Sequence, residues 1–219
     1  MPVEIQKTGD GSHTLFIPEM NETYHSIHGA VNESLHVFIK NGFLASNARP
    51  VKILEVGFGT GLNAWLTLIE AGKQQIKVQY TGYEFYPLPD DMLRALNYPS
   101  MLDDQFRDEF YQLHKISWDG AADITPFFSL EKKKEDLTIA SVECKFDVIY
   151  FDAFAPEKQP EMWTPAVYSK MYNALLPGGI LVTYCAKGEV RRSLGAAGFA
   201  MEKLAGPPGG KREMLRGRK

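Results

Sequence analysis

The sequence predicts an α/β fold in which a mostly parallel sheet carries helices on both faces. From residue 50 onward, short apolar runs such as residues 51–57 alternate with segments of helical periodicity such as residues 62–72. The apolar runs lack the polar alternation of a half-exposed sheet, which is typical of buried parallel strands. With 219 residues, 44% of them hydrophobic and 23% charged, the chain is long enough for one large domain with a buried core.

Residues 1–49 are expected to form a small extension ahead of a main domain over residues 50–219. Two apolar segments flank the turn sequence GDGS, which predicts a β-hairpin over residues 3–17. A helix is expected over residues 29–43. Its predicted buried face consists of Val31, Leu35, Phe38 and Ile39, and Gly42 ends it.

In the main domain we expect strands and helices to alternate. The expected strands cover residues 51–57, 77–85, 110–118, 145–154 and 178–186, with two short strands near 200–205 and 211–217. The expected helices cover residues 62–72, 87–98, 160–176 and 188–199. A polar stretch containing EKKKED, residues 131–136, is interpreted as an exposed insertion. Ligands of such folds bind outside the carboxyl ends of the strands, where the strand order reverses.

Three glycines at positions 57, 59 and 61 follow the first expected strand of the main domain. A phosphate-binding P-loop would need Gly-Lys-Ser/Thr after the loop, but Gly61 is followed by Leu62 and Asn63. A dinucleotide fingerprint, G-x-G-x-x-G, would need a glycine where Leu62 stands. The loop therefore favours a third class of ligand, a nucleoside that carries an amino acid.

Acidic residues around this loop support that interpretation. Glu55 precedes Gly57 by two positions and is expected to hold a ligand ammonium group directly or through water. Glu84, 27 residues after Gly57, ends the next expected strand, where a carboxylate can accept both ribose hydroxyls. The combination predicts an S-adenosylmethionine site in a class I methyltransferase with a Rossmann-like sheet. Asp119, after the expected third strand, is a candidate contact for the adenine amino group, or else an exposed loop residue.

Asp152 ends the fourth expected strand in the sequence YFDAFAPEKQPEMWTP. A carboxylate at this position can orient an attacking amine and help remove its proton, although it could instead cap the strand end. Phe154 shapes the adjacent loop and is a candidate substrate contact. Trp163 is a candidate for stacking on a planar base, with core packing as the alternative.

Composition limits the possible partners and locations. The chain contains only Cys144 and Cys185 and no Cys/His cluster, so we expect no disulfide framework and no metal site. No apolar run approaches the roughly 20 residues of a membrane span, and no signal pattern begins the chain, so a cytoplasmic location is expected. The net charge is −3, yet the last 33 residues are strongly basic, which predicts an anionic partner or a solvated tail. These basic residues are Lys187, Arg191, Arg192, Lys203, Lys211, Arg212, Arg216, Arg218 and Lys219.

Several longer blocks resemble one family. They are YHSIHGAVNESLHVF, ILEVGFGTGLNA, FDAFAPEKQPEMWTP, LLPGGILVTYCAKGEVRRSLGAAGF and GGKREMLRG, and they span nearly the whole chain. They resemble the methyltransferase domain of MnmC, a tRNA wobble-uridine enzyme that also occurs as a stand-alone MnmD-type protein. The resemblance implies S-adenosylmethionine-dependent methylation of 5-aminomethyl-(2-thio)uridine to 5-methylaminomethyl-(2-thio)uridine in tRNA.

The resemblance also implies roles for single residues. Asp152 would sit beside the transferred methyl group and the target amine, while Glu33 would line the same pocket unless it is a solvent-facing helix residue or a helical cap. Lys211 and Arg212 would lie near the site or the tRNA backbone, in agreement with the basic C-terminal region. The cofactor contacts would be Glu55, Gly57, Gly59, Gly61 and Glu84.

The two-domain members of this family also carry a flavin-dependent oxidase domain, so we expect a separate upstream enzyme to make the aminomethyl group. Two alternatives stay open: a class I methyltransferase acting on a small amine or another RNA, and a nucleoside- or RNA-binding module without turnover. Acceptor specificity and turnover would separate these alternatives.

Overall fold

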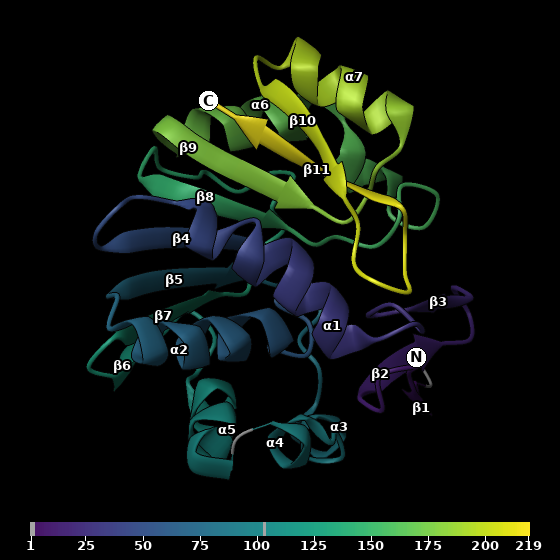
Figure 1. Cartoon of the computed structure of the whole chain (residues 1–219), viewed down its shortest axis with the longest axis vertical. Helices are drawn as coiled ribbons and strands as arrows, with labels where there is room; N and C mark the ends of the chain where they lie inside the picture. Colours follow the sequence, from purple (N-terminus) through teal and green to yellow (C-terminus); the bar gives the residue numbers. More distant parts are fainter. Residues whose placement is uncertain (1–2, 103) are drawn as a thin grey trace.

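The computed structural model describes residues 3–102 and 104–219, and it has the α/β architecture that the sequence predicts. Figure 1 shows a large sheet with helices packed on it and a small separate sheet near the N-terminus. The small sheet is antiparallel and consists of β1 (Glu4–Lys7), β2 (His13–Ile17) and β3 (Glu22–Thr23). The predicted hairpin is therefore confirmed, with β3 added.

The large sheet has eight strands in the order β10-β11-β9-β8-β4-β5-β7-β6. Its strands are β4 (Val51–Val56), β5 (Val78–Tyr83), β6 (Ala121–Thr125), β7 (Phe128–Lys133), β8 (Phe146–Phe151), β9 (Leu175–Thr183), β10 (Ala200–Ala205) and β11 (Glu213–Arg218). The five central strands β9, β8, β4, β5 and β7 are parallel, and the outer strands are antiparallel to their neighbours. The strand order reverses between β4 and β8, which makes this pair the expected ligand-binding edge.

The helices lie between these strands in the sequence. They are α1 (Ala30–Ser34), α2 (Leu62–Gln74), α3 (Asp90–Arg94), α4 (Tyr98–Met101), α5 (Arg107–Lys115), α6 (Pro165–Ala174) and α7 (Gly188–Ala196), with a π-helix at Leu35–Lys40 and short 3₁₀ turns at Phe43–Ala45, Asp104–Phe106 and Pro160–Trp163. Local signals explain the start of α6: Thr164 caps the helix by accepting from the Val167 amide, and Pro165 occupies the first helical position. No helix in residues 3–102 and 104–219 is long and apolar enough to cross a membrane.

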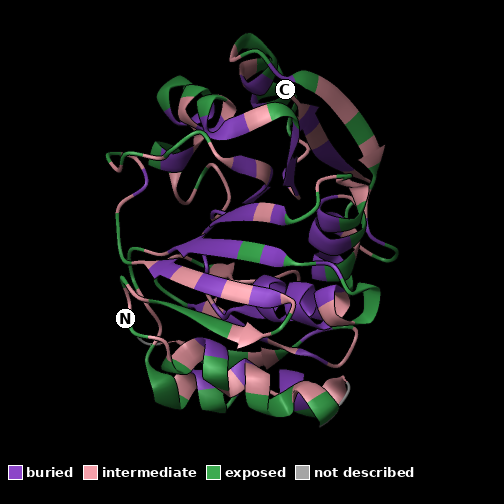
Figure 2. Cartoon of the chain, turned by 90° about the vertical axis from the view of Figure 1, so that its left-hand side faces the viewer, coloured by how far each residue is buried: buried purple, intermediate pink, exposed green. Residues whose placement is uncertain are grey.

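Alternate residues of the strands point to opposite faces of the sheet and pack in two separate hydrophobic cores. Ile53 and Tyr150 face the core formed with α2 and the π-helix, whereas Leu54 and Phe151 face the core formed with α6 and α7. Figure 2 shows buried residues gathered on the strands and on the helix faces turned toward them. The nearly continuous apolar runs seen in the sequence are thus explained by burial on both faces of the sheet.

Three local expectations are wrong. The segment expected as a third strand, residues 110–118, lies mainly in α5, because Phe110 and Leu113 are spaced for one buried helical face. Residues 131–133 of the expected insertion instead end β7. Lys132 there is only 2% exposed, with its ammonium nitrogen 4.6 Å from the centre of the Trp118 ring. Leu35 is 38% exposed, because the π-helix that begins there changes the rotation per residue.

Candidate functional site

A cavity of about 640 Å³ opens at the carboxyl ends of β4, β5 and β8. Its walls come from the glycine loop after β4, the segment after β5, the loop after β8 and residues 16–28 of the N-terminal extension. The volume lies in the range of small-molecule sites. Because both parts of the chain line this cavity, the division into residues 1–49 and 50–219 stays a prediction.

The glycine loop brings its backbone against the loop after β8. Gly57 has φ +84°, and a Cβ atom on it would lie 2.7 Å from the carbonyl oxygen of Asp152. Gly59, with φ +50°, faces the Tyr24 ring, while Gly61, with φ +71°, packs against His114 below the cavity. Gly57 and Gly59 line the cavity and Gly61 does not, so the third glycine serves the start of α2.

Gly57→Ala should therefore lose more stability than an ordinary glycine replacement. The left-handed conformation costs about 1–2 kcal/mol for an L residue, and the clash with the Asp152 carbonyl adds to that cost. Gly178→Ala is the matched control, since Gly178 has φ +80° and a Cβ atom on it would meet no other atom within 4 Å. We expect a lower melting temperature for Gly57→Ala than for Gly178→Ala; equal losses in the two variants would contradict the clash.

Glu84 stands directly after β5 and is held at the cavity by two backbone amides. Its Oε2 accepts from the Gly59 amide at 3.0 Å, and its Oε1 accepts from the Tyr86 amide at 2.9 Å. Each carboxylate oxygen keeps a further lone pair for a ligand hydroxyl. The position expected from the sequence is thus occupied by a fixed carboxylate that faces the cavity.

Asp152 follows β8 and belongs to a polar cluster that runs from the cavity into the buried interior. The amide nitrogen Nδ2 of Asn63 donates to Asp152 Oδ2 at 2.8 Å and to Glu55 Oε1 at 2.9 Å. Asp152 and Asn63 line the cavity, whereas Glu55 is fully buried beneath the loop and is not part of the lining. Glu55 therefore does not face the cavity directly, and the contact through water, the other form expected from the sequence, stays a prediction.

The electrostatic environment of Asp152 favours its neutral form. Burial at the bottom of the cavity raises the pKa of Asp152 to about 8, and the nearby Glu33 carboxylate contributes to that rise. The hydrogen bond from Asn63 and the charge of Lys211 act in the opposite direction. The carboxyl group is therefore set to exchange a proton near neutral pH.

The N-terminal extension supplies one wall. Glu33 of α1 is only 9% exposed, lines the cavity and accepts from the Ser26 amide at 3.1 Å, so it is not a solvent-facing helix residue. Burial raises the pKa of Glu33, and Lys211 opposes that shift. His25 Nε2 lies 2.8 Å from Thr60 Oγ1 of the glycine loop, and burial lowers the pKa of His25 to about 4.

The loop between β10 and β11 places Lys211 at the cavity. Its ammonium nitrogen lies 3.9 Å from the centre of the Tyr184 ring, and the Tyr184 hydroxyl donates to the Ala153 carbonyl at 2.9 Å. Arg212 is exposed and lies outside the cavity lining. The structure thus brings only the first of the two basic residues to the site.

Two aromatic residues after β8, Phe154 and Trp163, lie differently with respect to the cavity. Phe154 lines the cavity and its ring meets the Tyr24 ring edge to face, with centroids 5.0 Å apart. Trp163 is outside the lining; its Nε1 donates to the Phe154 carbonyl at 2.7 Å and its ring packs on Phe151. Trp163 therefore does not face the cavity, where it could stack on a substrate base; it supports the loop after β8 from the side away from the cavity.

Asp119 is also away from the cavity. It is exposed in the turn between α5 and β6, where its Oδ1 accepts from the Lys134 amide at 3.1 Å. The expectation failed because residues 110–118 lie mainly in a helix, so Asp119 does not follow a parallel strand. The segment after β7 reaches the cavity instead and brings Asp136 into the lining.

Sequence reasoning missed several lining residues. Tyr24 and His25 belong to the block YHSIHGAVNES, and Asn63 ends the glycine motif GFGTGLN, so both motifs contained a signal. Tyr184 also lies in a quoted block, LLPGGILVTYCAKGEVRRSLGAAGF, whereas Asp136 lies in none, because its position depends on the true course of β7. Within the described ranges, no group of three or more His, Cys, Asp or Glu side chains is arranged to hold a metal ion.

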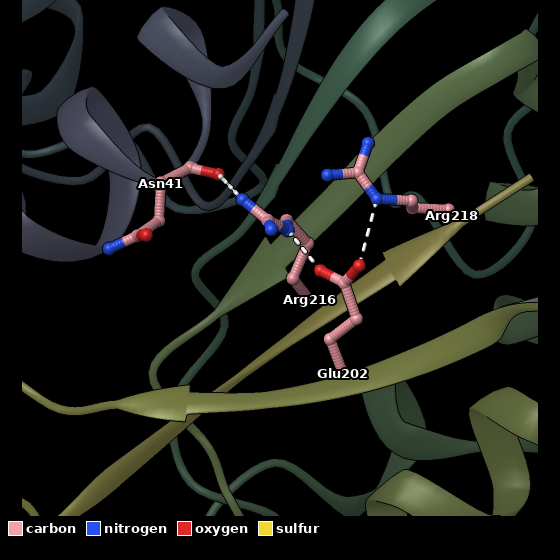
Figure 3. A network of polar contacts seen from close by, with 4 residues as sticks. All are labelled: Asn41, Glu202, Arg216 and Arg218. Carbon is pink, nitrogen blue, oxygen red and sulfur yellow. Dashed lines mark hydrogen bonds and ion pairs between the residues drawn. The ribbon is translucent and has the colours of Figure 1, made fainter.

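Ion pairs neutralise part of the basic C-terminal region. Glu202 binds both Arg216, at 2.5 Å, and Arg218, at 3.0 Å, as Figure 3 shows. Lys187 pairs with Glu157, and Lys203 pairs with Glu213. In the described part of the chain, the basic residues of this region without an acidic partner include Arg191, Arg192, Lys211 and Arg212.

The cavity fits S-adenosyl-L-methionine. A Cβ atom on Gly57 would clash with backbone and one on Gly59 would crowd the Tyr24 ring, so the loop brings bare backbone to the cavity wall. Glu84 presents a fixed carboxylate to the cavity, and the acidic lining suits a ligand that carries sulfonium and ammonium groups. The sheet order and this site define the class I methyltransferases that use S-adenosyl-L-methionine.

Comparison with known proteins agrees with that class. Residues 104–219 match the family described as S-adenosyl-L-methionine-dependent methyltransferase, and the chain belongs to this family. It is 32% identical, over 86% of its length, to the tRNA 5-methylaminomethyl-2-thiouridine biosynthesis bifunctional protein MnmC of Pseudomonas entomophila (strain L48). The Pseudomonas aeruginosa (strain UCBPP-PA14) protein of the same name is also 32% identical, over 90% of this chain. The chain spans about a third of the length of these curated relatives, 31% and 32%.

Solved structures show the same fold. MNMC2 from Aquifex aeolicus superposes with a TM-score of 0.81 at 27% identity, over 99% of this chain and 70% of that one. Spermidine synthase from Thermotoga maritima superposes with a TM-score of 0.59 at 15% identity, over 100% of this chain and 72% of that one. The second likeness concerns the fold alone.

Proposed function

We propose that this protein transfers the methyl group of S-adenosyl-L-methionine to the side-chain amine of 5-aminomethyl-(2-thio)uridine at the wobble position of tRNA. The product is 5-methylaminomethyl-(2-thio)uridine. The observation that carries the proposal is the Asp152 carboxyl group at the cavity floor beside the glycine loop, in a chain whose relatives are named for this modification.

The cavity chemistry supports an amine as the acceptor. An aminomethyl group is largely protonated at neutral pH, and its nitrogen must lose that proton before it can attack a methyl group. Asp152 is the proposed proton acceptor, and Glu33 adds a second carboxyl group that can accept a hydrogen bond from the substrate amine. The cofactor supplies a methyl group activated on a sulfonium, so the protein contributes mainly alignment and proton removal.

The remaining roles follow from position. Gly57 and Gly59 let the cofactor lie on the loop, and Glu84 binds its ribose. Asp136 replaces Asp119 as the proposed contact to the adenine amino group. Phe154 and Lys211, which also line the cavity, are the proposed substrate contacts.

Basic residues outside the cavity provide the proposed tRNA contacts. Arg212 in the β10–β11 loop and Arg191 and Arg192 on α7 are the candidates. Phosphate contacts of this kind make affinity fall steeply with salt concentration. The proposed setting is the cytoplasm, with a separate upstream enzyme that makes the aminomethyl group.

The decisive experiment measures transfer of labelled methyl groups from S-adenosyl-L-methionine to three tRNA preparations. One carries 5-aminomethyluridine at the wobble position, one is fully modified and one is unmodified. We expect label only on the first, at the wobble nucleotide. Label on a small amine and on none of the tRNAs would favour the alternative of a small-molecule methyltransferase.

A further inference from the structure

One side chain at the cavity floor connects two carboxyl groups, one that lines the cavity and one buried beneath it. Nδ2 of Asn63 donates both of its hydrogens, one to Asp152 Oδ2 at 2.8 Å and one to Glu55 Oε1 at 2.9 Å. Asn63 is only 2% exposed, so little solvent competes for these bonds. An amide held at both hydrogens has a fixed plane, and that plane fixes the Asp152 oxygen it binds.

The backbone of Asn63 is held as well. Thr67, one turn later on α2, donates from Oγ1 to the Asn63 carbonyl at 2.7 Å. The Tyr150 hydroxyl on β8 lies 3.2 Å from the same Thr67 oxygen. Asn63 is therefore anchored to β4, α2 and β8 together, which makes it a rigid support rather than a mobile ligand contact.

Glu55 completes the support from the other side. Its Oε1 accepts from Asn63, and the Tyr80 hydroxyl of β5 is a second polar group beside the carboxyl, although no hydrogen bond of full geometry reaches Oε2 from the described residues. No ion pair to a lysine or arginine is seen for it among the described residues, and it is fully buried. Burial raises the pKa of Glu55 well above its ordinary value, and the nearby Asp152 carboxyl group adds to that rise, so the charged form of Glu55 is disfavoured.

From these contacts we propose that Asn63 is a positioning residue for Asp152, with Glu55 holding Asn63 in place. The bond to Oδ2 leaves Oδ1 of Asp152, which no hydrogen bond from the described residues reaches, as the atom presented to the acceptor amine. This inference rests on the proposed function for its substrate, an amine, and adds to it the residues that orient the proton acceptor. It also gives Glu55 a structural role in place of the expected ligand contact.

Asp152 has several charged or titratable neighbours besides Asn63. Glu33 comes from α1, Glu55 from β4, Tyr80 from β5, Tyr184 from the end of β9 and Lys211 from the β10–β11 loop. Asn63 is the only side chain in the described ranges that donates a hydrogen bond to the carboxylate. Its removal should therefore destabilise the charged form of Asp152 specifically.

The test compares Asn63→Leu, Asn63→Ser and Glu55→Gln with the wild type. Gln74→Leu, at the exposed end of the same helix, is the matched amide-to-leucine control. Two measurements need no tRNA: the titration of Asp152 followed by ¹³C NMR of aspartate carboxyl groups, and the affinity for S-adenosylhomocysteine by calorimetry. The pH dependence of methyl transfer to 5-aminomethyluridine tRNA is the third.

In Asn63→Leu we expect the Asp152 titration to move up by about one pH unit, since the one hydrogen bond to its charged form is lost. The rate at pH 7 should fall about tenfold or more and recover in part at higher pH, whereas Asn63→Ser should show a smaller shift. Glu55→Gln should keep its affinity for S-adenosylhomocysteine within about threefold. Gln74→Leu should behave as the wild type.

Two results would overturn the inference. One is an unmoved Asp152 titration in a folded Asn63→Leu protein, or in Asn63→Ser if the leucine variant does not fold. The other is a loss of S-adenosylhomocysteine affinity of more than about tenfold in Glu55→Gln, which would make Glu55 a cofactor anion. If wild-type protein labels no tRNA while the titration shift is present, the proposed tRNA function fails and the positioning role stands.

Discussion

Asp152→Asn is expected to lower the rate of methyl transfer about 10²-fold or more, the range that a positioned acid–base group supplies. The asparagine keeps the size of the side chain and its contact with Asn63, but it cannot accept a proton from the acceptor amine. Affinity for S-adenosylhomocysteine should change little. Single-turnover transfer to 5-aminomethyluridine tRNA, together with calorimetric binding, measures both quantities.

The same substitution should stabilise the protein at alkaline pH. The pKa of Asp152 is about 8 in the folded protein and about 3.9 in an unfolded chain, so between these values the folded state binds more protons. The free energy of unfolding therefore falls as pH rises through that window, which is opposite to a salt-bridged aspartate. Asp152→Asn removes this penalty, so its melting temperature should exceed that of the wild type more at pH 8 than at pH 5.

Activity of the wild type should follow the opposite trend with pH. Only the ionised carboxylate accepts a proton, so kcat/KM should rise between pH 6 and about pH 8. Asp147→Asn is the matched control, because Asp147 lies on β8 at the end away from the cavity, where its side chain accepts from the Lys52 amide. Near-full activity in Asp152→Asn, or equal stabilisation by both substitutions, would contradict the assignment.

Glu84→Ala is expected to weaken S-adenosyl-L-methionine binding about 10²-fold or more. It removes the proposed ribose contact, and it leaves the amides of Gly59 and Tyr86 without their acceptor. A hydrogen bond to a charged group contributes about 1.5–3 kcal/mol, so the loss of the two proposed bonds from the ribose hydroxyls to Glu84 accounts for a change in affinity of this size. Calorimetric titration of the cofactor measures the change.

Glu131→Ala serves as the control for Glu84→Ala. Glu131 lies on the neighbouring strand β7, pairs with Lys133 at 2.8 Å and does not line the cavity. Its removal should leave cofactor affinity at the wild-type value. Unchanged affinity in a folded Glu84→Ala protein would remove the ribose assignment.

Errors in the sequence analysis came from segments whose local pattern is ambiguous. Residues 110–118 contain aromatic and β-branched residues that favour a strand, but burial of Phe110 and Leu113 against α2 makes residues 107–115 a helix. Lys132 looked like part of an exposed charge run, yet it is buried against Trp118. In both places contacts between distant segments outweighed local preference.

Local sequence by itself determined the α/β class, the glycine loop and the acids at the strand ends. These features depend on short-range chemistry: apolar runs that must be buried, glycines at positive φ, and carboxylates directly after parallel strands. Glu84 and Asp152 therefore lie where their sequence positions predict.

Only the tertiary structure decided how those acids are used. Asn63 lies between Glu55 and Asp152 because β4 and β8 are neighbours in the sheet and α2 crosses beside them. The N-terminal extension closes the cavity with Tyr24, His25 and Glu33, far in sequence from the glycine loop. Burial, which only the assembled fold creates, raises the pKa of Asp152 and converts a carboxylate at a strand end into a group that can exchange a proton near neutral pH.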